Sequence, residues 1–390
     1  MNLTVSASQL RDVVNFMAGN VPNRPIEPIL KATRLNAQGD LLTLSATDHI
    51  VWVRQAIPAQ VKTPGEIYVD AELLSGIAKS LGEGEVKLSS KKRLTITQSG
   101  KRRSLPPMDG EGFPEEPCPE FKVGWDQSVQ SFIYRAEQVG FAVSQDMSRP
   151  ILMGINMDMK NQLMVGADGF RMAIYKTDFG DADLKPTFSM RFLQEVKRSG
   201  MGGTILISVS ETWIRGLSED GLIAVWAKGL SGAYPTEAAQ ITKAMLEKDG
   251  IELEIEKAPL VQSLSLACLY SDRARNSSED AILYLVADKG KVRLEMTVPS
   301  IAELKDNIPG EAGGDLMVKL EPHYFLGIVN HVDADTVKIR YFDAGKPILI
   351  TDPNSVGWAA VLTQMIVREP SSPVQQVVDK YTEEDNEGDF

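Results

Sequence analysis

The 390-residue sequence has few of the residues that usually build a metal or catalytic centre. It contains two cysteines, Cys118 and Cys268, and three histidines, His49, His323 and His331. Neither set has the spacing of a zinc site. We therefore expect no metal, reduced structural thiols, and histidines in exposed or core positions.

The sequence also lacks a long apolar run and a positive net charge. No segment approaches the length of a membrane span, and Met1 leads directly into patterned sequence without the apolar core of a signal peptide. We therefore expect a cytoplasmic protein without membrane contact. The formal net charge of −12 disfavours a protein that coats nucleic acid by bulk electrostatics. Contact with DNA would require basic residues gathered on one face.

Two motifs that could carry chemistry are better explained as turns. The glycine-rich stretch 199–204 (SGMGGT) follows a predicted helix and precedes a predicted strand, whereas a phosphate-binding loop needs the reverse order. Asp168-Gly169 could supply a catalytic carboxylate, but no second carboxylate or nucleophile recurs at a matched place, and Asp-Gly between strands is typical of a tight turn. The sequence assembles no active site, so we expect neither an enzyme nor a cofactor.

What the sequence does contain is a threefold repeat. Three similar patterns begin at Arg24, Arg149 and Arg275, which lie 149 − 24 = 125 and 275 − 149 = 126 positions apart. A period of about 120 residues has the size of a domain, so the sequence predicts three copies of one domain. Two further sets of markers keep similar offsets: Leu73, Phe192 and Phe325 (119 and 133), and Leu88, Ile207 and Ile339 (119 and 132).

Periodicity predicts an α+β fold with two helices and about eight short strands in each copy. The proline-rich stretch 106–119 ends the first copy, which includes a strand at 42–53. The domains are placed at 1–121, 122–247 and 248–368, followed by a polar, acidic tail at 369–390 that we expect to be disordered. The predicted helices span 6–17, 70–81, 127–143, 190–198, 238–247, 259–270 and 322–330.

Segments 146–154 (DMSRPILMG) and 167–172 (ADGFRM), with Ala46-Thr47-Asp48 and Pro64-Gly65-Glu66 near the start, carry a family pattern. They resemble the bacterial DNA polymerase III β subunit, the sliding clamp. The resemblance spans about residues 1–365 and is weakest in the third copy. It implies a head-to-tail homodimer that closes a six-domain ring, encircles double-stranded DNA without sequence preference and tethers a polymerase. Repeated domains with unpaired sheet edges also favour a closed circle.

The resemblance implies that helices line the ring, so basic residues on the helices and at their ends are candidates for DNA contact. Acidic residues on the same helices, including Asp70, Glu72, Glu137 and Glu195, offset them, so binding should be weak and salt-sensitive. For any one residue the alternative is a solvated helix face. The candidates are Arg11, Arg24, Lys79, Arg135, Arg149, Arg191, Lys197, Arg198, Arg273 and Arg275.

The family binds short peptides of the DNA polymerase and the clamp loader in a pocket. Residues 167–172 stand where the family has a Thr-Asp-Gly-His-Arg-Leu segment, and 361–365 (VLTQM) where it has a Met-Pro-Met-Arg-like run. Both depart from the pattern, so we expect a pocket that is present but altered. Its candidate residues are Leu152, Ala167, Gly169, Phe170, Arg171, Met172, Pro235, Val361 and Leu362.

The implied dimer interface joins an edge near 101–105 in the first copy to an edge near 296–303 in the third. Arg103 stands where we expect an aromatic, which predicts a more ionic and salt-sensitive interface. The candidate contacts are Arg103, Leu105, Leu269, Tyr270, Met296 and Glu303. Two alternatives remain: a clamp-fold scaffold that binds replication proteins without being loaded on DNA, and an enzyme built on a duplicated fold.

Overall fold

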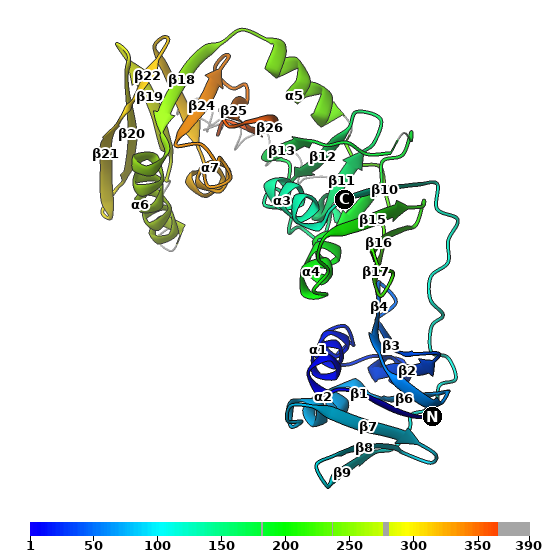
Figure 1. The fold of residues 1–390 in the computed structure, drawn as a ribbon. Coiled ribbons are helices and arrows are strands. Elements are labelled where there is room, and N and C mark those ends of the chain that lie inside the picture. The colour runs from blue at the N-terminus through cyan, green and yellow to red at the C-terminus, as the bar shows by residue number, and fades with distance from the viewer. Residues whose placement is uncertain (181, 236, 276–280, 366–390) are drawn as a thin grey trace, which may run out of the picture. The chain divides into compact units, whose positions relative to one another are not determined.

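The computed structural model describes residues 1–180, 182–235, 237–275 and 281–365 (Figure 1). The predicted tail at 369–390 lies outside these residues. The chain divides into two compact units, Met1–Gln240 and Ile241–Phe390. The first unit contains two copies of the repeat, and the second contains the third.

The order of elements confirms the threefold repeat. Each copy runs as one strand, a helix, a group of strands, a second helix and three final strands. The two helices of each copy pack against each other. They are α1 (Ala7–Ala18) and α2 (Ala71–Lys79), α3 (Val129–Gly140) and α4 (Met190–Arg198), and α6 (Lys257–Arg275) and α7 (Pro322–Val329), with α5 (Glu237–Glu247) preceding the third copy.

The described residues form 26 strands. In the first copy these are β1 (Asn2–Ser6), β2 (Ala32–Gln38), β3 (Leu41–Thr47), β4 (Val51–Pro58), β5 (Gln60–Thr63), β6 (Gly65–Asp70), β7 (Glu85–Ser90), β8 (Leu94–Gln98) and β9 (Lys101–Leu105). In the second they are β10 (Val123–Ser128), β11 (Gly154–Asp158), β12 (Leu163–Ala167), β13 (Arg171–Lys176), β14 (Thr187–Ser189), β15 (Thr204–Val209), β16 (Trp213–Ser218) and β17 (Ile223–Lys228). In the third they are β18 (Ile251–Glu256), β19 (Leu283–Asp288), β20 (Lys291–Val298), β21 (Ala302–Ile308), β22 (Gly310–Ala312), β23 (Leu316–Leu320), β24 (Thr336–Tyr341), β25 (Ile348–Asp352) and β26 (Ser355–Leu362).

Each copy uses its strands in the same spatial order. The first strand and the last three strands of a copy form one group, which β5 joins in the first copy and β22 in the third: β5-β1-β7-β8-β9, β10-β15-β16-β17 and β22-β18-β24-β25-β26. The middle strands form another: β6-β2-β3-β4, β14-β11-β12-β13 and β23-β19-β20-β21. In this correspondence β9 matches β17, and β21 matches β4.

The two strands β17 and β4 form a junction with each other inside the first unit. Strand β17 pairs antiparallel with β4, placing Trp226 opposite Trp52, and so joins strands of two copies into one eight-stranded sheet. The two indole rings meet edge to face, 5.5 Å apart and 82° inclined, and both are buried. Figure 1 shows α1, α2, α3 and α4 on one side of this sheet.

The linker between the first two copies covers the other side of the junction. We call residues 106–121 the linker strap. Phe113 and Phe121 of the strap pack against the tryptophan cluster, and the guanidinium of Arg215 lies 4.3 Å from the centre of the Phe121 ring. Arg54 also pairs with Glu116 at 3.7 Å. The strap therefore fastens the first copy to the second along the sheet.

Local sequence explains where several elements begin. Asp70 caps α2 by accepting the Leu73 amide at 2.9 Å, and Glu321 caps α7 by accepting the Tyr324 amide at 2.7 Å. The single strand expected at 42–53 is wrong, because the Asp48 carboxylate accepts the amides of residues 50 and 51 and makes a turn between β3 and β4. Leu73, expected on the apolar stripe of its helix, is 54% exposed.

Candidate functional site

Two sheet edges correspond to the strands of the formed junction but have no strand partner on their outer side among the described residues. Strand β9 is the outer strand of its sheet, and so is β21 of its own, within the described residues. Their counterparts β17 and β4 pair with each other. The chain thus displays both halves of a junction that it also contains in completed form.

Charged side chains and exposed leucines mark both edges. Strand β9 has the sequence KRRSL and β21 has AELKDNI, so one edge is basic and the other carries acidic residues. Helix α2 contacts β9 and exposes Leu73. Helix α6 contacts β21 and exposes Leu266 and Leu269, at 40% and 51%. Each edge therefore combines unpaired backbone groups, charge and apolar surface.

The predicted interface residues have different positions relative to these edges. Glu303 is exposed on β21, and Arg103 is half-buried on β9, where it donates to the Ser80 carbonyl at 3.4 Å. Met296 was expected at the edge, but it belongs to the interior strand β20 and is 1% exposed. The expected edge near 296–303 begins in β20 and crosses the turn at 299–301, so only its last residues lie on the outer strand β21. Leu269 is exposed, whereas Leu105 is buried and Tyr270 half-buried.

Half of the predicted DNA contacts are engaged in ion pairs. Lys197 pairs with Glu137, and Arg11 lies 3.9 Å from Glu83. Arg275 pairs with Glu321 at 3.2 Å. The other five form no ion pair within the described residues. Arg135 is half-buried, and Arg24, Lys79, Arg149 and Arg273 are exposed.

Two of the engaged arginines connect the first and second copies. Arg191 of α4 pairs with Asp48 of the β3–β4 turn. Arg198 donates to Glu195 at 2.8 Å, and the same buried carboxylate accepts the Asn20 amide at 2.9 Å. Their positions indicate that these side chains stabilise the junction between helices.

The ADGFRM segment forms the turn between β12 and β13. Asp168 accepts the amides of Phe170 and Arg171, each at 2.9 Å, and pairs with the Arg171 side chain at 3.1 Å. Gly169 has φ of +97°, which other residues rarely adopt, so the predicted Asp-Gly turn is confirmed. The turn leaves Phe170 57% exposed.

The other predicted pocket residues in the first unit differ in exposure. Leu152 and Met172 are buried, Ala167 is 8% exposed, and Pro235 is exposed. Burial, together with the Asp168 carboxylate, raises the pKa of Tyr234 well above its ordinary value, so its hydroxyl stays protonated. Val361 and Leu362 belong to β26 of the second unit, where both are buried.

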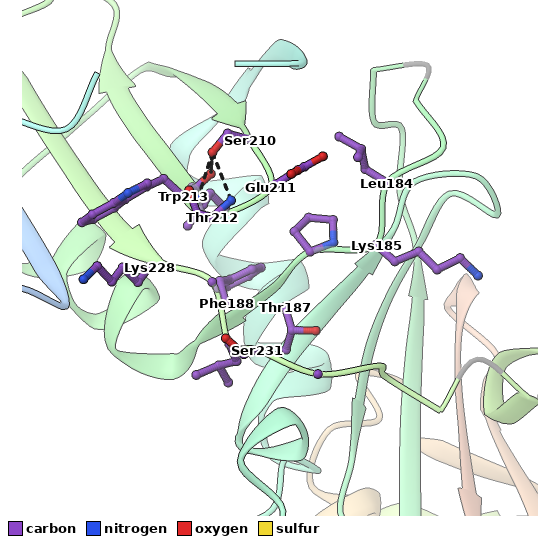
Figure 2. Close-up of a pocket in the computed structure, with 15 residues that line it drawn as sticks. Leu184, Lys185, Thr187, Phe188, Ser210, Glu211, Thr212, Trp213, Lys228 and Ser231 are labelled. Atoms are coloured by element: carbon purple, nitrogen blue, oxygen red, sulfur yellow. Dashed lines mark hydrogen bonds between the residues drawn. The ribbon is translucent and has the colours of Figure 1, made fainter. Parts of the chain in front are cut away.

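The structure also contains a cavity that the sequence did not predict. It has a volume of about 580 Å³ and lies in the second copy, between the ends of β14, β16 and β17 (Figure 2). Phe188, Trp213 and Lys228 contribute to its lining. Ser210 holds one wall by accepting the Trp213 amide at 2.9 Å. No predicted pocket residue lines it, and its residues come from three separate stretches, so no local sequence signal could have identified it.

The described residues contain no group of three or more His, Cys, Asp or Glu side chains placed to hold a metal ion. No helix in the same residues is long and apolar enough to cross a membrane. Gly200 and Gly203 adopt positive φ between α4 and β15, so the stretch 199–204 forms the predicted turn.

Comparison with known proteins assigns both ends of the chain. Residues 1–117 match the DNA polymerase III beta subunit, N-terminal domain, and residues 245–366 match its C-terminal domain. The chain is similar to a beta sliding clamp of Chlamydia pneumoniae, with 24% identity over 91% of this chain and 96% of the relative. The fold matches the DNA polymerase sliding clamp of Bacillus subtilis (TM-score 0.84, 20% identity) and the beta subunit of Streptococcus pyogenes (TM-score 0.85, 18% identity), each over 94% of this chain and 100% of the other. Together with the threefold repeat, these matches show that the chain belongs to the DNA polymerase III beta subunit family, the beta sliding clamps.

Proposed function

We propose that two copies of this chain close a ring around double-stranded DNA and tether a DNA polymerase to it. The observation that carries the proposal is the formed β17–β4 junction, whose counterparts β9 and β21 remain unpaired in the described chain. When β9 of one copy pairs with β21 of another, and the reverse, the assembly closes with two-fold symmetry. Pairing also removes exposed edges that would otherwise favour aggregation.

The chemistry of the two edges supports this pairing. Basic residues on β9 face acidic ones on β21 in the proposed junction, with Arg103 and Glu303 as one candidate pair. Exposed Leu73 on one side and Leu269 on the other supply apolar surface to bury. Because charged groups at the rim of an interface are screened by salt, dimerisation should weaken as ionic strength rises.

Five basic candidates that form no ion pair with other described residues are available for weak contact with DNA: Arg24, Lys79, Arg135, Arg149 and Arg273. Five others are neutralised by carboxylates, which lowers the number of phosphates that the chain can bind. Fewer phosphate contacts give weaker and less salt-dependent binding. This arrangement suits a ring that slides and is retained by topology.

Partner peptides of the polymerase and clamp loader are proposed to contact the β12–β13 turn. Phe170 presents an exposed aromatic there, and Leu152 and Met172 of the same copy are buried. Exposed aromatics beside apolar side chains are typical anchors for short peptides. The family pattern also implies that Val361 and Leu362 of the second unit contact these peptides.

The decisive experiment compares retention of the chain on circular and linearised duplex DNA in the presence of a clamp loader. A ring that encircles DNA should remain on circles and leave linear molecules at their ends. Sedimentation should find a dimer of about twice 42.8 kDa. Equal loss from circular and linear DNA by a chain that still binds polymerase peptides would favour the scaffold alternative.

A further inference from the structure

The outward face of sheet β5-β1-β7-β8-β9 carries a continuous row of small polar residues. In the strand register, Thr63 lies opposite Asn2, Asn2 opposite Ser89, Ser89 opposite Thr95, and Thr95 opposite Ser104. Each of the five strands contributes one member. Neighbouring strands lie about 4.8 Å apart, so the row extends for about 19 Å. The buried apolar side chains of the same strands, among them Leu3, Leu88 and Ile96, alternate with the row and point the other way, into the core.

Cations border this row, and acids are missing from it. A groove of about 700 Å³ lies over the row and includes Lys91, Lys92 and Arg93 from the β7–β8 turn, and Arg102 from β9. We call it the basic groove. Its lining contains no aspartate or glutamate, and none of its cations forms an ion pair within the described residues. In a chain of net charge −12, such a concentration of unneutralised positive charge indicates an anionic occupant.

The lining favours a peptide over a single-stranded nucleic acid. Proteins that hold single strands without sequence preference stack bases on aromatic side chains. The basic groove has hydroxyl, amide and cationic groups but no aromatic residue. An acidic peptide needs only these groups, because its carboxylates accept hydrogen bonds from hydroxyls and pair with lysine and arginine.

The chain's own sequence contains a segment with the required charge. Residues 383–389 (EEDNEGD) carry five carboxylates and no basic residue. Seven extended residues span about 23 Å, close to the length of the polar row. The segment lies among residues 366–390, outside the described part of the chain, and 25 residues can span about 80 Å.

We infer that the basic groove binds the acidic segment 383–389 of this chain. Binding rests on charge and on hydrogen bonds from the polar row, so it should be moderate in strength and lost at high salt. This site shares β9 with the proposed ring junction, through Arg102 and Ser104, and is separate from the turn that carries Phe170. Occupation of the groove also prevents other anions from binding there.

A labelled peptide of residues 379–390 tests the inference by fluorescence anisotropy. The titrant is the full-length chain whose own segment is neutralised by Glu383→Gln, Glu384→Gln, Asp385→Asn, Glu387→Gln and Asp389→Asn. Adding Lys91→Ser and Lys92→Ser should weaken peptide binding about tenfold, because two exposed charge pairs are lost. The matched control changes Lys289→Ser and Lys291→Ser, two exposed lysines on the β19–β20 turn, and should leave affinity unchanged.

Three results would overturn the inference: no binding at low salt, equal losses in test and control variants, or equal affinity for a peptide whose carboxylates are all replaced by amides. Tighter binding of a labelled dT oligonucleotide than of the peptide, lost in the Lys91→Ser/Lys92→Ser variant, would assign the groove to nucleic acid instead. The measurement needs neither a closed ring nor duplex DNA. Failure of the proposed clamp function would therefore not affect it.

Discussion

The completed junction between β17 and β4 differs in composition from the free edges β9 and β21, although all four strands occupy matching places in the repeat. The completed junction buries Trp52 and Trp226 and is covered by the linker strap. The free edges carry lysine, arginine and glutamate beside exposed leucines. One topology therefore supports a permanent joint inside the chain and, as we propose, a separable joint between chains.

The energies of these contacts explain the difference. Removing a large buried aromatic typically costs about 3–5 kcal/mol, whereas an exposed ion pair contributes about 0–1 kcal/mol. A junction built on Trp226 and Trp52 should stay closed under all conditions in which the unit is folded. A junction built on exposed charges can open when salt or a partner protein competes.

The largest expected effect comes from removing one ring of the tryptophan pair. Trp226→Ala should lower the free energy of unfolding of the first unit by about 3–5 kcal/mol, since it leaves a cavity beside Trp52. Urea unfolding followed by circular dichroism measures the loss. Trp213→Ala, at a half-buried position of the same sheet, should cost clearly less. Equal losses would show that the permanent joint does not depend on the buried pair.

A smaller effect is expected at the helix contact beside the permanent joint. Glu195→Ala leaves the buried Asn20 amide without its carboxylate acceptor and should cost about 1–3 kcal/mol in urea unfolding. Glu137→Ala removes a carboxylate that forms an exposed pair with Lys197, and should change stability by less than about 1 kcal/mol. If the two variants lose the same stability, burial of Glu195 is not the reason for its contribution.

Charge reversal tests the separable joint. Arg103→Glu should weaken dimerisation about tenfold, because it places like charges at the proposed junction, and leave the unfolding of the first unit nearly unchanged. Sedimentation at two salt concentrations measures the change. The double variant Arg103→Glu/Glu303→Arg should recover much of the affinity. Without recovery, these two residues do not face each other.

The smallest effect concerns the two thiols, one near each kind of joint. Cys118 is exposed in the linker strap, and burial raises the pKa of Cys268 on α6 to about 12. Since the thiolate is the reactive form, Cys118 should react with a thiol reagent at pH 8 and Cys268 should not until the chain unfolds. Rapid labelling of Cys268 in the folded protein would indicate that α6 opens locally.

The sequence was sufficient for features that depend on pattern over a whole domain. Offsets between Arg24, Arg149 and Arg275 revealed the repeat, and the motif at 167–172 identified the family. Features that depend on strand order were missed. The implied interface placed Met296 at an edge, and only tertiary pairing shows that β21 lies outside β20.

The functional surfaces show the same limit. The charge of Lys91-Lys92-Arg93 is visible in the sequence as a basic turn, but the groove also needs Thr63, Asn2 and Ser104 from distant strands. Ion pairs were equally hidden, since Arg191 meets an aspartate 143 positions away. The residue types predicted which side chains could bind a ligand or form an ion pair. Identifying the partners of those side chains required the three-dimensional structure.

The linker strap has a mechanical consequence. Its sequence contains five prolines between Pro106 and Pro119, which restrict backbone rotation. The first two copies are thus connected twice, through the shared eight-stranded sheet and through the linker strap packed on the tryptophan cluster. Two connections should make the pair resist bending. In the ring that we propose, the first two copies of each chain would therefore move as one stiff segment.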